Sequence, residues 1–97
     1  MGRYIGVKVD GRLVAMGGER LNPGSYVELS GICTHPDFRG RGFAMGISGE
    51  LSRNIIERGL VPFLYVKFEN VPANRLYEKL GFSSIGSVPG CAIMKKV

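Results

Sequence analysis

The hydrophobic pattern of this chain changes its period once, at the glycine- and arginine-rich stretch of residues 39–42. Before that stretch, apolar residues alternate with polar ones, which is the pattern of half-buried β-strands. After it, apolar residues recur at steps of three and four, which is the pattern of an amphipathic helix. Short turns, the first at Asp10-Gly11, separate three predicted strands: residues 4–9, 12–21 and 25–34. A chain that begins this way places an antiparallel meander directly before a helix.

The rest of the chain alternates helices and strands. The first helix runs from about Gly42 to about Arg58, and residues 61–68 form an apolar run typical of a strand buried on both faces in a parallel pairing. The remaining predicted elements are a helix over 72–80 and strands over 82–88 and 92–97. The order β-β-β-α-β-α-β-β predicts the α/β (α+β) class, with a mixed, mostly antiparallel sheet and one right-handed crossover.

Length and composition limit where the chain works. Its 97 residues make a single domain, 1–97, and no apolar run reaches the ~18 residues of a membrane span. The alternating start does not have the pattern of a signal peptide. Cys33 and Cys91 lie in apolar segments without metal-like spacing, so we expect buried, reduced thiols, no metal site and a cytoplasmic location.

The charge pattern predicts an anion site at the start of the first helix. The net charge is +5, and Arg39 and Arg41 cluster beside Gly40 and Gly42. A helix start offers free N–H groups and a positive dipole end, and glycine lets an anion approach them closely. The alternative is a plain glycine-rich connection with solvated arginines. A nucleic-acid binder is disfavoured, because its positive charge should form an extended stripe with stacking aromatics.

Familiar phosphate-binding motifs do not explain this loop. Gly40, Gly42 and Gly46 miss the G-x-G-x-x-G spacing by one residue, and no Gly-Lys-Ser/Thr is present. The residue pattern alone therefore predicts a phosphate-type ligand and leaves its identity open.

Two motifs, taken together and in order, resemble the GNAT superfamily of acyl-CoA N-acyltransferases, in the branch similar to glycine N-acyltransferases. The first is HPDFRGRGFA, in which Arg39, Gly42 and Ala44 match the Arg/Gln-x-x-Gly-x-Gly/Ala signature of the family. The second is ENVPANRLYEKLGF, and its matching residues are Asn70, Ala73, Leu76, Tyr77, Gly81 and Phe82. The resemblance extends from about Tyr4 to the end of the chain and implies the GNAT fold.

The resemblance implies acetyl-CoA as the co-substrate. Its diphosphate would bind backbone amides of residues 39–44, and its pantetheine arm would pair with the third strand near a bulge that separates that strand from the next. An amide at this bulge would donate to the thioester oxygen. The implied cofactor-binding residues are Ile32, Cys33, Thr34, Arg39, Gly40, Arg41, Gly42, Phe43, Ala44, Asn70, Ala73 and Tyr77.

Two residues are candidates for catalysis. The resemblance implies that the Tyr77 phenol protonates the leaving thiolate, although its ring could instead only pack under the second helix. Glu28 is the candidate base, eleven residues before Arg39. On an extended strand it would share a face with Ser30 and Ile32. Its alternatives are an ordinary solvent-facing glutamate or replacement by a chain of water molecules.

Two other reactive side chains receive structural interpretations. Cys33 could accept the acyl group, but family members typically transfer it directly, so packing is favoured. His35 precedes Pro36 in a turn, which favours a turn or cofactor-rim role over a role as base.

The chain departs from the family at its start, which resembles the second strand of full members. The preceding strand and the two helices that wall the acceptor site are not found. Three explanations stay open: an excised C-terminal domain, a compact natural version, or a protomer that completes its site as a homodimer. The predicted function is direct transfer of an acetyl group to the primary amine of a small molecule or peptide. The alternative is a non-catalytic acyl-CoA-binding or regulatory module.

Overall fold

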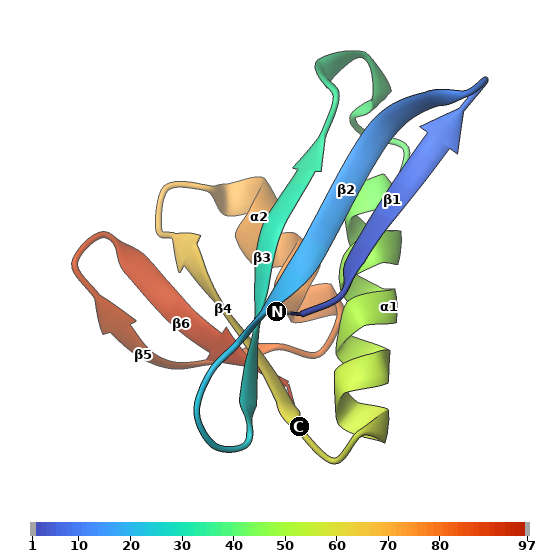
Figure 1. The fold of residues 1–97 in the computed structure, drawn as a ribbon. Helices are drawn as coiled ribbons and strands as arrows, with labels where there is room; N and C mark the ends of the chain where they lie inside the picture. Colours follow the sequence, from blue (N-terminus) through green and yellow to red (C-terminus); the bar gives the residue numbers. More distant parts are fainter. Residues whose placement is uncertain (1, 97) are drawn as a thin grey trace.

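The computed structural model describes residues 2–96 and contains one mixed sheet with two α-helices (Figure 1). In chain order the elements are β1 (Tyr4–Val9), β2 (Arg12–Leu21), β3 (Tyr26–Thr34), the 3-10 turn η1 (Pro36–Phe38), α1 (Phe43–Glu57), β4 (Val61–Lys67), α2 (Val71–Lys79), β5 (Ser83–Val88) and β6 (Cys91–Lys95). The sheet order is β1-β2-β3-β4-β6-β5. Among the strands that the structure describes, only β3 and β4 pair in parallel. No helix among the described residues is long and apolar enough to cross a membrane.

The predicted fold class and element order are confirmed. Predicted and observed elements differ only at their ends, and η1 is the one described helical segment that the sequence did not indicate. The predicted last strand includes Val97, which lies outside the described residues. The hairpin at Asp10-Gly11 has positive φ at both positions, 52° and 77°, as a type I′ turn requires.

The core lies between the sheet and the two helices. On α1, the stripe of Ile47, Leu51 and Ile55 is almost fully buried against the strands. On α2, Ala73, Tyr77 and Leu80 are partly buried against the same core. The strand side chains of this core are Ala15, Val27, Leu29, Leu64, Val66, Ala92 and Met94. Both helices therefore cover one face of the sheet.

A bulge in β3 changes which side chains share a face. The β2–β3 register passes from Gly18↔Ser30 to Met16↔Cys33, so β3 carries one extra residue, and Gly31 has φ +67°. Ile32 packs against the core beyond the bulge, as Leu29 does before it. Glu28 and Ser30 lie on the opposite face. The expectation that Glu28 shares a face with Ile32 is therefore wrong, because it assumed unbroken alternation.

The strands β3 and β4 separate soon after they meet. Their parallel pairing covers only Tyr26–Glu28 and Val61–Phe63, after which neither strand has the other as a partner (Figure 1). The predicted bulge and the predicted separation of the two strands are both observed. The gap opens toward the start of α1 and the start of α2, because these helices follow the diverging ends of β3 and β4.

The face of the sheet away from the helices is only partly covered. Phe63 is 9% exposed beneath edge-on contacts with Tyr26 and Tyr65, but Tyr65 itself is 49% exposed. The expectation that β4 is buried on both faces is therefore wrong for its second half. A continuous apolar run indicated burial, whereas aromatic residues can shield one another on an open face.

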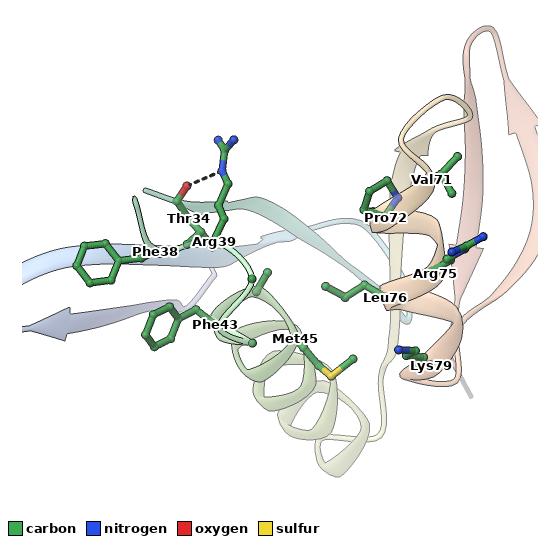
Figure 2. Close-up of a pocket in the computed structure, with 13 residues that line it drawn as sticks. Thr34, Phe38, Arg39, Phe43, Met45, Val71, Pro72, Arg75, Leu76 and Lys79 are labelled. Atoms are coloured by element: carbon green, nitrogen blue, oxygen red, sulfur yellow. Dashed lines mark hydrogen bonds between the residues drawn. The ribbon is translucent and has the colours of Figure 1, made fainter. Parts of the chain in front are cut away.

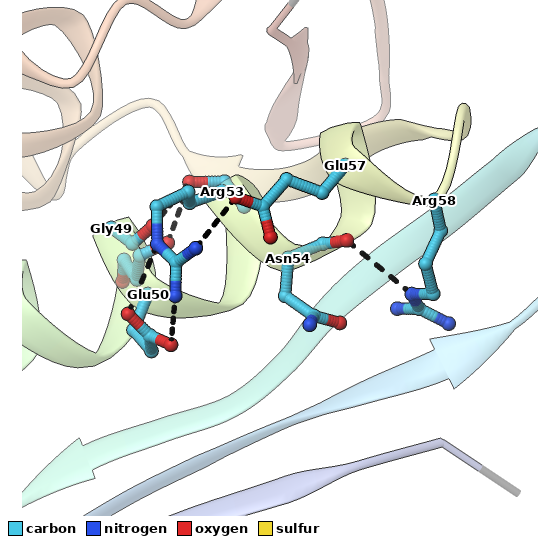
Figure 3. A network of polar contacts seen from close by, with 8 residues as sticks. Gly49, Glu50, Arg53, Asn54, Glu57 and Arg58 are labelled. Carbon is cyan, nitrogen blue, oxygen red and sulfur yellow. Dashed lines mark hydrogen bonds and ion pairs between the residues drawn. The ribbon is translucent and has the colours of Figure 1, made fainter.

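The C-terminal end of α1 is tied to the sheet by an ion pair. Arg58, which caps the helix, donates to Glu19 of β2 at 2.7 Å, and the Glu19 side chain is 1% exposed. One turn earlier, Arg53 bridges Glu50 and Glu57 on the solvent side of the helix (Figure 3). These contacts fix the C-terminal end of α1.

Candidate functional site

Three adjoining cavities form one groove between α1, α2 and the separated ends of β3 and β4. The largest, about 570 Å³, lies between the start of α1 and α2, and neighbouring cavities of about 330 and 420 Å³ continue toward Tyr77. Ala44 and Leu76 line all three, which makes the groove continuous. Figure 2 shows Leu76 and Met45 directed into the space between the two helices. We call this feature the α1–α2 groove.

The start of α1 presents unpaired backbone donors to this groove. Its N-cap is Gly42, with φ 84°, which supplies no side-chain oxygen, and the first turn contains no acidic residue. In the described part of the chain, no N–H group from Gly40 to Met45 donates a hydrogen bond within the protein. A Cβ at Gly40 or Gly42 would meet nothing within 4 Å, so the space beside these two glycines is open.

This geometry suits an extended phosphate ligand. Successive free N–H groups at the positive end of a 15-residue helix can donate to several anionic oxygens at once. Arg39 is fixed beside them by a 3.3 Å hydrogen bond from its Nε to the carbonyl oxygen of Thr34 (Figure 2). Arg41 lies over the Phe38 ring, 4.8 Å from its centroid, and leaves its charge exposed. The residues therefore fit the diphosphate of coenzyme A.

The start of α2 is satisfied from within the protein. The Asn70 side-chain oxygen accepts from the N–H of Ala73 at 3.2 Å, which makes Asn70 the N-cap, and Pro72 in the first turn has no N–H to satisfy. Asn70 and Ala73 both line the deeper part of the groove. The amide nitrogen of Asn70 makes no hydrogen bond with another described residue and is free for a ligand.

Tyr77 lies at the inner end of the groove with Ala44, Asn70 and Tyr65. Its ring packs edge-on against Phe82, with centroids 5.7 Å apart. Burial raises the pKa of the Tyr77 phenol above its usual value, and the Ser48 hydroxyl lowers that pKa by a smaller amount. The phenol is therefore protonated at neutral pH.

Ser48 lies beneath this end of the groove, one helical turn after Ala44. It is fully buried, and its Oγ has no hydrogen-bond partner among the described residues. The Ser48 and Tyr77 hydroxyls thus interact without reaching hydrogen-bond geometry in this conformation. A small shift of the phenol would give each hydroxyl a partner.

The structure brings together nearly all of the predicted cofactor-binding residues. Those that line the groove are Ile32, Cys33, Thr34, Arg39, Gly40, Gly42, Phe43, Ala44, Asn70, Ala73 and Tyr77. Arg41 is at its edge over Phe38 and does not line it. Glu28 is half-buried on the open face of the sheet, apart from the groove, at the point where β3 and β4 separate.

The cysteine and histidine predictions have different outcomes. Cys33 is exposed and Cys91 is half-buried, so the expectation of buried thiols is wrong for Cys33. The reason is the bulge, which leaves Cys33 opposite Met16 on the face without helices. The turn role predicted for His35 is confirmed, because its Nδ1 accepts from the N–H of Asp37 at 3.1 Å and caps η1.

Sequence reasoning missed one wall of the groove. It identified the loop before α1 but not the α2 residues that face it, which are Val71, Pro72, Arg75 and Lys79. The signal was available in the spacing, because residues 72, 75, 76 and 79 lie on one side of a helix. That this side faces α1 is decided by tertiary packing.

Comparisons with known proteins agree with this geometry. The family model described as FR47-like protein matches residues 4–88. An acetyltransferase of Pectobacterium atrosepticum is 33% identical over 88 residues, covering 88% of this chain and 60% of that protein. An acetyltransferase of Yersinia enterocolitica is 34% identical over 84 residues, covering 84% of this chain and 57% of that protein. The chain thus spans a little under two-thirds of these curated relatives.

Solved structures show the same fold. A GNAT-family protein of Novosphingobium aromaticivorans superposes with a TM-score of 0.84 at 41% identity, over 97% of this chain and 40% of its own. The PaiA N-acetyltransferase of Thermoplasma acidophilum, solved in complex with coenzyme A, superposes with a TM-score of 0.85 at 20% identity, over 96% of this chain and 58% of its own. The predicted fold type is therefore confirmed.

Proposed function

We propose that this chain, which belongs to the FR47-like family of GNAT acetyltransferases, transfers an acetyl group from acetyl-CoA to a primary amine of a small molecule or peptide. The observation that carries the proposal is the continuous groove from the free N–H groups of α1 to the Tyr77 phenol. A ligand with a diphosphate at one end and a thioester at the other would match both ends.

The donor half of the reaction is assigned to the groove. Backbone N–H groups from Gly40 to Met45, with Arg39, would bind the diphosphate. The β3 edge from Leu29 to Thr34, which has no strand partner on the β4 side, would pair with the amides of the pantetheine arm. The Asn70 amide nitrogen would donate to the same arm. This arrangement places the thioester where β3 and β4 separate, near Tyr77.

The chemistry then needs a base, an oxyanion donor and an acid. Glu28 would remove a proton from the ammonium form of the acceptor, whose nitrogen attacks the thioester carbonyl from the open face of the sheet. An N–H at the Gly31 bulge would donate to the developing oxyanion. As the C–S bond breaks, Tyr77 would give its proton to the thiolate sulfur. The proton that the nitrogen still loses returns to the phenolate through solvent.

The protonated state of the Tyr77 phenol is compatible with the role of acid. A phenol that stays protonated at neutral pH always holds the proton that it must give, and burial is the cause of the shift. Ser48 would hold the phenol in place through its free Oγ. Assignment to the branch similar to glycine N-acyltransferases rests on the sequence motifs and stays part of this proposal, as do a cytoplasmic location and a homodimer.

The experiment compares binding and turnover in matched variants. Tyr77→Phe should lower kcat for acetyl transfer to an amine panel by about 100-fold or more. The Kd for coenzyme A, measured by calorimetry, should change less than about twofold. Tyr4→Phe, at a tyrosine that is 60% exposed and outside the groove, is the control and should retain full turnover. Equal turnover in wild type and Tyr77→Phe would contradict the assigned role.

A non-catalytic acyl-CoA-binding module is the second candidate. The observation that favours it is the position of Glu28, which lies outside the groove that holds Tyr77. Tight binding of acetyl-CoA without turnover across the whole amine panel would support this reading. Loss of turnover in Glu28→Gln, with acetyl-CoA affinity retained, would support the enzyme.

A further inference from the structure

The wall of the α1–α2 groove opposite residues 39–44 carries two cations that the proposed mechanism does not use. Arg75 and Lys79 are four residues apart on α2 and therefore lie on the same side of that helix. Both line the cavity of about 570 Å³ that also contains the start of α1 (Figure 2). Neither makes an ion pair with another described residue. Their charge is thus available to a ligand in the groove.

The surroundings of this wall are poor in acidic groups. None of the residues that line the cavity is acidic, and the first carboxylate on α1 is Glu50, two turns into the helix. Glu78 is on α2 but does not line the cavity. Three cations, Arg39, Arg75 and Lys79, therefore line one cavity from two sides. A diphosphate at the start of α1 would occupy only the first side.

We propose that Arg75 and Lys79 form a second phosphate site, which binds the 3′-phosphate on the ribose of coenzyme A. This inference rests on the proposed use of acetyl-CoA. Coenzyme A carries a diphosphate and, separately, a phosphate monoester with about 1.5 to 2 negative charges at neutral pH. The diphosphate binds the N–H groups at the start of α1, and the monoester binds the side chains of Arg75 and Lys79 on α2. The site would thus distinguish coenzyme A from nucleotides that lack the 3′-phosphate.

The size of the effect follows from the exposure of both side chains. Arg75 and Lys79 are exposed, so each contact with the phosphate is screened by water and salt. Two such contacts together correspond to an affinity ratio of about 5 to 30 between coenzyme A and 3′-dephospho-coenzyme A at low salt.

A double-mutant cycle tests this assignment, with the 3′-phosphate as one partner. Calorimetry measures the Kd of each nucleotide for the wild type and for Arg75→Ala/Lys79→Ala. We expect the ratio of about 5 to 30 in the wild type to fall below about 2 in the variant. The Kd of 3′-dephospho-coenzyme A should hardly change. Lys79→Arg keeps the charge and should keep most of the ratio.

A charge-matched control separates a local site from the general positive field. Arg3→Ala/Arg20→Ala removes the same charge from residues outside the α1–α2 groove and should leave the ratio unchanged. The inference is overturned if the wild type does not distinguish the two nucleotides, or if the ratio survives in the α2 variant. If neither nucleotide binds the wild type, the proposed function itself has failed.

Discussion

The two helices begin in the same groove but differ in whether a side chain accepts hydrogen bonds from their first N–H groups. At α2, the Asn70 side chain accepts from Ala73 and closes the helix end within the protein. At α1, Gly42 provides no side-chain acceptor, and the N–H groups from Gly40 to Met45 have no partner in the protein. Residues 40–42 are exposed, so solvent can satisfy these donors and a ligand can reach them. The start of α2 is thus closed within the protein, whereas the start of α1 is left accessible to a ligand.

The largest expected effect comes from giving α1 the cap that it lacks. Gly42→Asp should weaken coenzyme A binding by about 100-fold, because a carboxylate would accept from the same N–H groups and repel the diphosphate. The free energy of unfolding should change by less than about 1 kcal/mol, since the gain of a cap offsets the strain of positive φ. Calorimetry and thermal melts measure the two quantities.

Gly42→Asn is the matched variant for that experiment. It supplies a neutral cap, and asparagine tolerates the left-handed conformation. Its loss of affinity should therefore be smaller than that of Gly42→Asp. Equal affinity in the wild type and both variants would mean that the start of α1 does not bind the diphosphate.

Removing the cap from α2 should act on stability. Asn70→Ala should lower the free energy of unfolding by about 1 kcal/mol. For a domain of this size the melting temperature should fall by about 4–8 °C. Asn70→Asp keeps the accepting oxygen and should retain stability, but it loses the amide donor proposed for the pantetheine arm. A normal melting temperature for Asn70→Ala would show that the cap contributes little.

Replacing a glycine inside α1 should raise the stability of the protein, in contrast to removal of the α2 cap. A Cβ at Gly46 would meet nothing within 4 Å, so no close approach of another backbone requires this glycine. Gly46→Ala should raise the free energy of unfolding by about 0.5–1 kcal/mol, because alanine loses less entropy in a helix. Coenzyme A affinity should not change. A drop in affinity would mean that the ligand passes over this turn.

The smallest effect is a pH dependence at the inner end of the groove. Burial raises the pKa of Tyr77 in the folded protein, so the folded state holds this proton more tightly than the unfolded state. The associated stability is fully present below the unfolded value of about 10 and is lost as pH rises through the folded pKa. In Tyr77→Phe, the decline of the unfolding free energy above about pH 10 should be shallower than in the wild type. Identical slopes for the wild type and Tyr77→Phe would contradict a raised pKa of Tyr77.

The sequence predicted the loop before α1 better than it predicted the surroundings of Glu28. Residues 39–44 are contiguous, so glycine content and the change of period located the donors without knowledge of the fold. Glu28 was placed on the wrong face relative to Ile32, because a single extra residue at Gly31 reverses the alternation. Cys33 was misjudged for the same reason. Arg75 and Lys79 were not recognised, because their relevance depends on which wall of the groove α2 forms.

The sequence by itself determined the order of elements and the uncapped start of α1, since these depend on periodicity, glycine and turn residues close together in the chain. The tertiary structure decided where β3 and β4 separate, which side chains the bulge turns outward, and that α2 faces the start of α1 across the groove. Those features arise from contacts between residues far apart in the sequence, and local preferences do not encode them. The chain therefore specifies its anion donors locally and its complete ligand groove only by folding.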